Sequence, residues 1–342
     1  MNAATSRRRL VALVAALGGA LAISVGAQAQ APIVIKFSHV VANDTPKGKA
    51  SEFFAKRAAE LTKGKVKVDV YANSTLYKDK EEMEALQLGS VQMLAPSLSK
   101  FAPLGVKEFE IFDFPYIFDS YADLHKITEG PVGKSLMAKL DAKGISGLAF
   151  WDNGFKSFSS NRKMQKPEDM KGLKMRIQSS KVLEAQMRAL GAIPQVLAFG
   201  EVYQALQTGV VDGTENPHSN LYTQKMNEVQ KNITITDHGY IGYAVVVNKK
   251  FWEGLPADIR GQLTQAMADA TKFTNEDALK DNEGALAKVK ATGKTEILTL
   301  TKEERAVWKR ALVKVHKEME SRVGTEIIQA VYKETGFDPT KV

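Results

Sequence analysis

Residues 33–71 read IVIKFSHVVANDTPKGKASEFFAKRAAELTKGKVKVDVY, and this stretch decides the fold class. Its first five residues, Ile33 to Phe37, form a short apolar run of the kind that a buried strand requires. After Pro46 the apolar residues recur three and four apart, which predicts a helix ended by Gly64. From Lys65 to Tyr71 lysine and valine alternate, and a period of two predicts a half-buried strand.

The same alternation of strands and helices continues along the chain. Residues 79–88 read as a helix and 91–95 as a strand, so the first series is strand, helix, strand, helix, strand, which indicates a parallel sheet wound with helices. A second series begins near Gly147. Its predicted strands are residues 148–151, 156–158, 173–177, 233–236 and 244–247, and its predicted helices are 181–190 and 199–207. We therefore predict an α/β protein with two sheets.

One predicted helix is unusually long. From Pro256 to about Lys290 helix-forming residues continue almost without a breaker, Pro256 suits a first turn, and Gly293 suits the end. At a rise of 1.5 Å per residue this helix is about 50 Å long, whereas a small domain is about 30 Å across. We expect it to lie across both lobes of the protein. The alternative is two shorter helices joined at residues 282–284, where Gly284 could form a kink.

The first 29 residues have the three parts of a signal peptide. Three arginines at positions 7–9 precede an apolar run over residues 10–25, and Ala27-Gln28-Ala29 provides a small-x-small cleavage site. We predict export to the periplasm and a mature chain that begins at Gln30. A retained N-terminal anchor is the alternative, and the sequence leaves the export route open between the general and the twin-arginine pathways.

The charge does not indicate a nucleic-acid partner. The full chain carries a formal charge of +8, and removal of residues 1–29 leaves 44 basic and 39 acidic residues. The lysines and arginines are interleaved with glutamate on amphipathic helices such as 302–317, as on a solvated face. The chain has no cysteine, which excludes disulfides and thiolate chemistry.

We found none of the common catalytic motifs. The mature chain lacks GxSxG, HExxH, GxxxxGK[ST] and GxGxxG, and its five histidines never occur at metal-ligand spacing. We therefore expect no cofactor and no metal. These absences argue against an enzyme but do not exclude one, because paired catalytic carboxylates need no sequence signature.

Three stretches between Trp151 and Pro217 carry the functional signal. They are WDNGFK at 151–156, DMKGLKMRIQ at 169–178 and FGEVYQALQTGVVDGTENP at 199–217. In their order and spacing they resemble the solute receptors of tripartite ATP-independent periplasmic (TRAP) transporters, and most closely the C4-dicarboxylate receptors. The resemblance extends over essentially the whole mature chain, including KFSH at 36–39 and FWEGLP at 251–256. It implies a two-lobe clamp of the periplasmic binding protein type.

The resemblance also assigns roles to individual residues. Pattern alone predicts that Arg176 lies on a solvated strand face, that Asn216 before Pro217 is a turn residue, and that Phe199 belongs to the core. The resemblance implies instead that Arg176 holds the ligand carboxylate and that Asn216 donates to the same group, with Phe199 beside the ligand. A guanidinium suits this role because its planar fork donates two parallel hydrogen bonds.

Lys156 is the position at which the sequence departs from part of the family. Sialic-acid-type receptors have arginine in the pattern Asn-Gly-x-Arg, whereas this chain has Asn153-Gly154-Phe155-Lys156. We interpret the lysine as favouring a small diacid over a sugar acid. Either a protein acid neutralises Lys156, or the ligand does. If the ligand neutralises it, the ligand's distal carboxylate binds Lys156 or a first-lobe group such as His39. The remaining alternative is that Lys156 and Arg176 bind the same carboxylate.

The remaining candidate contacts come from loops that follow strands, where open α/β sheets bind ligands. They are His39, Asp79, Ser97 and Ser99, together with Asn153 of the Asn-Gly motif. The resemblance implies lobe I at residues 30–153 and 242–281 and lobe II at 154–241 and 282–342. It also implies a monomer that delivers its carboxylate to ion-gradient-driven membrane permease subunits.

Two alternatives stay open. The first is a secreted enzyme acting on small organic acids, with Arg176 and Lys156 as substrate clamps and Glu215 or Asp79 as the base. The second is a receptor that feeds a sensor kinase instead of a permease.

Overall fold

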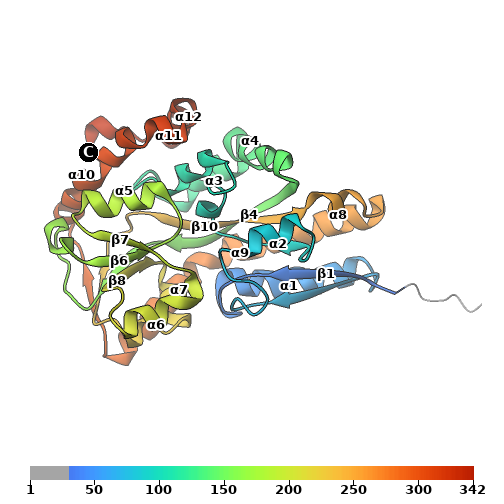
Figure 1. Ribbon diagram of the computed structural model, residues 1–342, viewed down its shortest axis with the longest axis horizontal. Coiled ribbons are helices and arrows are strands. Elements are labelled where there is room, and N and C mark those ends of the chain that lie inside the picture. The colour runs from blue at the N-terminus through green and yellow to red at the C-terminus, as the bar shows by residue number, and fades with distance from the viewer. Residues whose placement is uncertain (1–30) are drawn as a thin grey trace, which may run out of the picture. The chain divides into compact units, whose positions relative to one another are not determined.

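Two β-sheets form the framework of the protein (Figure 1). The computed structural model describes residues 31–342, so the predicted signal peptide lies outside the described residues. The first sheet has the order β2-β1-β3-β10-β4, with β1 Ile33–Ser38, β2 Val66–Tyr71, β3 Met93–Leu94, β4 Ile145–Phe155 and β10 Tyr240–Asn248. The second has the order β11-β9-β5-β8-β6-β7, with β5 Ser157–Ser160, β6 Lys174–Ile177, β7 Ile193–Val196, β8 Gly213–Asn216, β9 Asn232–Ile235 and β11 Glu296–Thr299.

The first sheet contains the predicted parallel unit. Strand β1 pairs in parallel with β2 and β3, and the connections are α1 (Pro46–Leu61) and α2 (Glu82–Gln87). Helix α1 begins as its sequence predicts, because Pro46 is in the first turn and the Thr45 side chain accepts a hydrogen bond from the Gly48 amide. Its Phe54 packs edge-on against Phe37 of β1 in the core. Strand β10 then adds antiparallel between β3 and β4.

The second sheet is built from the second predicted series. Helix α5 (Lys181–Ala189) lies between β6 and β7, and the predicted helix 199–207 is a 3₁₀ turn (Phe199–Glu201) followed by α6 (Val202–Gln207). Phe158, Met175, Leu183 and Trp308 are buried together in the core beside this sheet. Strands β7, β8 and β11 have four residues each and were not predicted.

The chain passes from one sheet to the other at two neighbouring places. Only Lys156 separates β4 from β5, and residues 236–239 separate β9 from β10. The Lys156 amide donates to the Gly239 carbonyl at 2.8 Å, which joins the two passages. The strands of the first sheet come mainly from the segments expected for lobe I, and those of the second sheet from the segments expected for lobe II. Residues 33–342 nevertheless form one compact unit. The lobe boundaries therefore stay a prediction.

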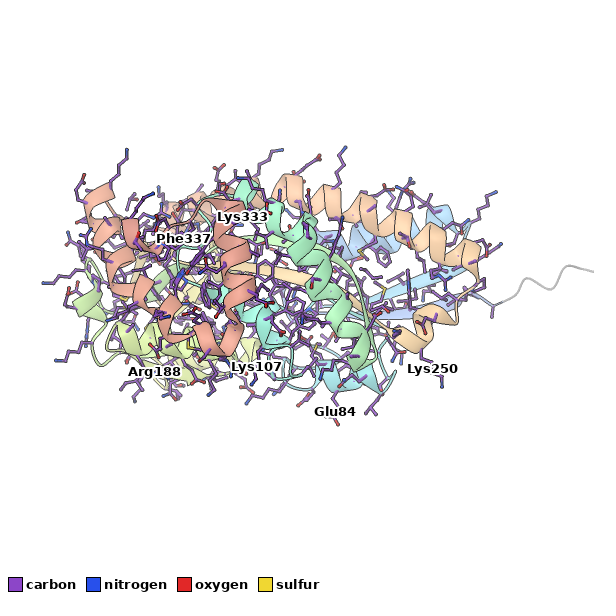
Figure 2. All side chains as sticks on the ribbon, turned by 90° about the horizontal axis from the view of Figure 1, so that it is seen from above. Glu84, Lys107, Arg188, Lys250, Lys333 and Phe337 are labelled. Atoms are coloured by element: carbon purple, nitrogen blue, oxygen red, sulfur yellow. The ribbon has the colours of Figure 1, made fainter. Side chains whose placement is uncertain are left out.

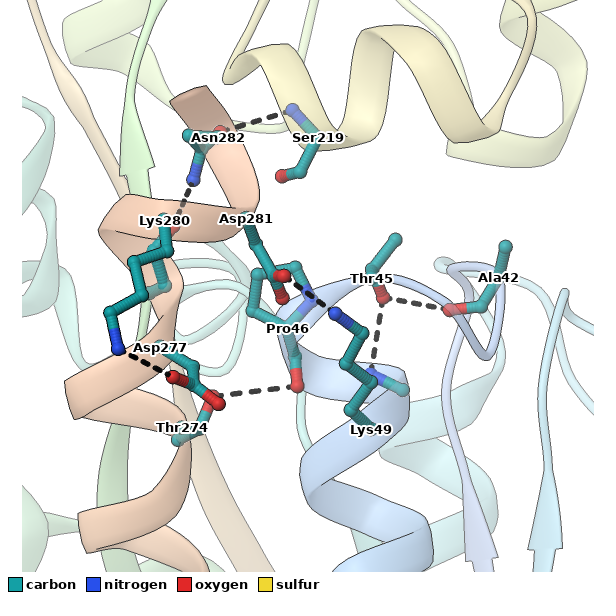
Figure 3. Close-up of polar contacts among 12 residues, drawn as sticks. Ala42, Thr45, Pro46, Lys49, Ser219, Thr274, Asp277, Lys280, Asp281 and Asn282 are labelled. Atoms are coloured by element: carbon teal, nitrogen blue, oxygen red, sulfur yellow. Dashed lines mark hydrogen bonds and ion pairs between the residues drawn. The ribbon is translucent and has the colours of Figure 1, made fainter. Parts of the chain in front are cut away.

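The long helix is continuous. Helix α9 (Ala257–Thr292) has 36 residues, follows Pro256, and ends at Gly293, whose φ of 64° is left-handed. The prediction of one helix is confirmed, and the alternative of two helices joined at residues 282–284 is wrong. Figure 3 shows contacts that hold the part of α9 between Thr274 and Asn282. Thr274 donates to the Pro46 carbonyl of α1, and the Asn282 side chain accepts from the Ser219 amide of α7 (His218–Thr223).

Further helices cover the framework. They are α3 Tyr121–Glu129, α4 Pro131–Lys139, α8 Lys249–Glu253, α10 Lys302–Glu318, α11 Glu320–Val323 and α12 Thr325–Thr335. Charged side chains of both signs are spread over the surface, for example Glu84, Arg188 and Lys250 (Figure 2). Within residues 31–342, no helix combines the length and the apolar character needed to cross a membrane.

Candidate functional site

A small cavity lies between the two sheets. The first sheet and its loops contribute Val40, Val41, Lys47, Asp79, Ser97, Ile241 and Tyr243 to its lining. The second sheet and its loops contribute Arg176, Gln178, Phe199, Asn216 and Asn220. Several of these residues stand at or just after the end of a strand, the position where open α/β sheets bind ligands.

Arg176 is the buried cation on the second sheet's side of the cavity. It lies on β6 and is 1% exposed, so the solvated strand face that pattern alone predicts is wrong. Nε and Nη2 both donate to the Leu197 carbonyl, at 3.1 and 2.9 Å, and these bonds fix the plane of the guanidinium. Its centre lies 5.7 Å from the Phe199 ring. A guanidinium has five N–H donors, so three stay available for a ligand.

Lys47 is the cation on the first sheet's side. It is 1% exposed, donates to the Ala95 carbonyl at 2.8 Å, and lies over the Tyr243 ring, 3.8 Å from its centroid. Burial lowers the pKa of Lys47 to about 8, although the Glu82 and Asp79 carboxylates oppose this shift. Burial also raises the pKa of Glu82 to about 8. Below pH 8 the lysine therefore carries its charge while Glu82 is largely neutral.

Lys47 was not predicted as a site residue, although the sequence contains a signal for it. The residue lies in the first turn of α1, directly after Pro46. A cation is unfavourable there because the N-terminus of a helix carries positive partial charge. Gln178, Asn220 and Tyr243 were missed as well, and for these we see no comparable signal in the sequence.

Asp79 and Asn216 are the predicted polar residues that line the cavity beside Arg176. Asp79 accepts from the Phe199 amide at 2.8 Å, and its Oδ2 is 4.0 Å from Arg176 Nη2. Burial raises its pKa, but the nearby Lys100 and Arg176 charges outweigh this effect and lower it overall. Asn216 Nδ2 donates to Thr214 Oγ1 at 3.2 Å, and its Oδ1 is buried without a partner. A 180° turn of this amide would let Thr214 donate to Oδ1 and would bring the two donors of Nδ2 to the place of the unpartnered oxygen.

Lys156 does not line the cavity. It is fully buried at the passage between the sheets, and its Nζ donates to Glu215 Oε1 at 2.8 Å. Glu215 Oε2 is 2.8 Å from His238 Nε2, and His238 Nδ1 is 2.7 Å from Thr236 Oγ1. Burial opposes ionisation of Glu215, but the Lys156 charge and the His238 hydrogen bond lower its pKa to about 2. In this structure a protein acid therefore neutralises Lys156.

The other predicted residues lie at different depths around the cavity. Ser97 lines it and accepts from Gln178 Nε2 at 2.6 Å, whereas Ser99 lies behind Ser97 at 3.2 Å between their hydroxyl oxygens. Asn153 is fully buried and donates to the Tyr243 hydroxyl at 2.8 Å, so it supports a lining residue. His39 is also fully buried and does not line the cavity. Its ring nitrogens have no partner, and burial lowers its pKa to about 3.

Two buried cations on opposite walls suit an anion with negative charge at both ends. Arg176 and Lys47 supply these charges, and Asn216, Asn220 and Tyr243 add uncharged polar groups to the same lining. Among residues 31–342, no set of three or more metal-ligating side chains is arranged to hold a metal ion.

The two sheets, the long shared helix and the cavity between them define the class of periplasmic solute-binding proteins. Residues 37–322 match the family described as "Bacterial extracellular solute-binding protein, family 7". The chain belongs to this family, and it is a periplasmic solute receptor of the TRAP type.

Three relatives illustrate the match. The C4-dicarboxylate-binding periplasmic protein DctP of Rhodobacter capsulatus is 64% identical over 95% of this chain and 98% of that protein. A TRAP solute-binding protein of Sulfurospirillum deleyianum with bound succinate is 49% identical, with a TM-score of 0.85 over 88% of this chain and 98% of that one. Another, from Pseudomonas aeruginosa with bound L-malate, is 43% identical, with a TM-score of 0.82 over 84% of this chain and 100% of that one.

Proposed function

We propose that this receptor captures a C4-dicarboxylate such as succinate, malate or fumarate, with one carboxylate on Arg176 and the other on Lys47. The observation that carries the proposal is the pair of buried cations contributed by the two walls of one cavity. Relatives that hold succinate and L-malate support this choice of ligand. Lys47 takes the place that the sequence suggested for Lys156 or His39, because Lys156 already faces Glu215.

We further propose that Arg176, Asn216 and Phe199 form the binding surface of lobe II, and that Lys47, Ser97 and Tyr243 form that of lobe I. The predicted lobes, residues 30–153 with 242–281 and 154–241 with 282–342, would then close on the ligand as a hinged clamp. The loaded, monomeric receptor would deliver the dicarboxylate to its TRAP permease. Deletion of the gene should abolish uptake of labelled succinate, and wild-type protein supplied from a plasmid should restore it.

The ligand should leave the receptor chemically unchanged. The acids that an enzyme would need as a base are poorly suited, because the pKa of Glu215 is lowered to about 2 and that of Asp79 is also lowered. A general base works best with a pKa near the working pH. Mass spectrometry after prolonged incubation with succinate, malate or fumarate should recover only the starting acid. Any turnover above a buffer control would contradict this part of the proposal.

Isothermal titration of protein freed of ligand tests the role of Lys47. Wild-type protein should bind succinate far more tightly than butyrate, since butyrate lacks the second carboxylate. Lys47→Met keeps the apolar stem and removes the charge, and it should weaken succinate binding by about 2 to 5 kcal/mol while changing butyrate binding much less.

The matched control is Lys49→Met. Lys49 is on the same helix but is 40% exposed and paired with Asp281. This variant should bind succinate like the wild type. Equal loss in the two variants, or equal affinity of the wild type for the two acids, would contradict the proposal.

A further inference from the structure

One group on the cavity wall has the wrong charge for an anionic ligand. Asp79 lines the cavity, is 5% exposed, and is held ionised by the cations around it. A carboxylate in this position repels a dicarboxylate. Its contacts therefore need an explanation other than direct binding.

Those contacts join the two walls of the cavity. Asp79 lies between β2 and α2 of the first sheet, and it accepts a 2.8 Å hydrogen bond from the Phe199 amide, which begins the 3₁₀ turn before α6 on the second sheet's side. On its own side Asp79 is paired with Lys100 at 3.2 Å. Both partners of this ion pair are less than 10% exposed. A charged acceptor shielded from water makes one of the stronger hydrogen bonds in proteins.

An exposed ion pair also crosses between the two walls, next to Asp79, and serves as a comparison. Lys78 Nζ lies 3.4 Å from Glu201 Oε1, with side chains that are 58% and 47% exposed. Exposed ion pairs contribute little because water and salt screen them. Of the two neighbouring contacts, the buried hydrogen bond of Asp79 should therefore contribute more to holding the two walls together.

We propose that Asp79 is a clasp that holds the two walls together over a bound ligand and thereby sets how long the ligand stays. Opening of the cavity must break the bond to Phe199 and the 4.0 Å contact with Arg176, whereas the pair with Lys100 on the first side is kept. The inference rests on the proposed function, because it concerns the lifetime of the dicarboxylate complex. In this role Asp79 positions the two walls and does not contact the ligand.

The negative charge of Asp79, taken alone, predicts the opposite effect on the rate of ligand release, so experiment can distinguish the two roles. Removal of the Asp79 charge leaves Arg176 and Lys100 more attractive to an anion, so a purely electrostatic role predicts slower release from Asp79→Ala. The clasp predicts faster release. Asp79→Asn should give an intermediate rate, because its amide oxygen can still accept from Phe199 but carries no charge.

Stopped-flow measurement of succinate release tests the clasp. We expect release from Asp79→Ala to be at least about tenfold faster than from wild type, the equivalent of about 1.4 kcal/mol. Asp79→Asn should fall between them, and the matched control Glu201→Gln should stay within about twofold of wild type. Release from Asp79→Ala at or below the wild-type rate would overturn the clasp. If thermal unfolding shows that Asp79→Ala does not fold, the release rate of Asp79→Asn is compared with that of wild type instead. Faster release then supports the clasp, and release at or below the wild-type rate overturns it.

The clasp and the proposed function can fail separately. If wild-type protein does not bind succinate, the proposed function fails, and hydrogen exchange at the Phe199 amide in ligand-free protein then tests the clasp. Faster exchange at this amide in Asp79→Asn than in wild type supports the clasp, and equal exchange overturns it.

Discussion

At the scale of single residues, Arg176 is the position on which we expect ligand binding to depend most. Arg176→Ala leaves the ligand carboxylate buried without its fork, which should cost about 2 to 5 kcal/mol, or a factor of roughly 30 or more in affinity. Arg176→Lys should recover only part of this loss, because a lysine cannot donate two parallel bonds. Calorimetry measures both effects, and circular dichroism checks the fold. Near-normal affinity of the alanine variant would show that another cation holds the carboxylate.

Lys47 should make binding sensitive to alkaline pH. Burial lowers its pKa to about 8, so it loses its charge as the pH rises through that value. Glu82, with a pKa raised to about 8, gains a negative charge over the same range. Both changes disfavour a dianion, so succinate affinity should be nearly constant between about pH 6 and 7 and should fall above pH 8. Affinity that stays constant up to pH 9.5 would argue against a role for Lys47.

At the scale of elements, the passage between the sheets depends on a buried ion pair. Lys156→Met removes the charge opposite Glu215 and leaves a fully buried carboxylate with only His238. Loss of one partner from a buried pair costs about 3 to 5 kcal/mol, so the free energy of unfolding in urea should fall by about that amount. The double variant Lys156→Met, Glu215→Gln should recover part of the loss. A single variant as stable as wild type would mean that the pair contributes nothing to the fold.

The elements also show what the sequence can and cannot predict. Helix α9 and strands β1 and β2 were predicted nearly to their ends, because a long run without a breaker, a short apolar run and a period of two are local signals. Strand β3 has only two residues, too few for any period. Arg176 was assigned to the site by family resemblance, since its alternation with apolar neighbours indicates a solvated face. That face is covered in the structure by the cavity wall, which distant segments build.

At the scale of the whole molecule, two buried histidines and one partly buried histidine should make the protein sensitive to acid. Burial lowers the pKa of His39 to about 3 and those of His218 and His316 to about 4, from an ordinary value of 6.5. Below pH 6.5 the unfolded chain binds these protons while the folded protein does not, so the histidines lower the stability as the pH falls. The raised pKa values of Glu82 and Asp113, about 8 and about 7, act in the opposite direction and offset part of this loss. Each histidine contributes up to about 1.4 kcal/mol per pH unit between pH 6.5 and its folded pKa. Urea unfolding at pH 7, 6 and 5 measures the slope, and equal stability at all three would contradict it.

Dicarboxylate binding of the proposed kind is a property of the whole molecule, since cations from two sheets must meet on one ligand. The most direct test is a crystal structure of the protein with succinate. We predict one carboxylate bound by the Arg176 fork and the other within hydrogen-bonding distance of Lys47 Nζ, with Lys156 still paired to Glu215. Succinate whose second carboxylate binds Lys156 or His39, or faces solvent, would contradict the account.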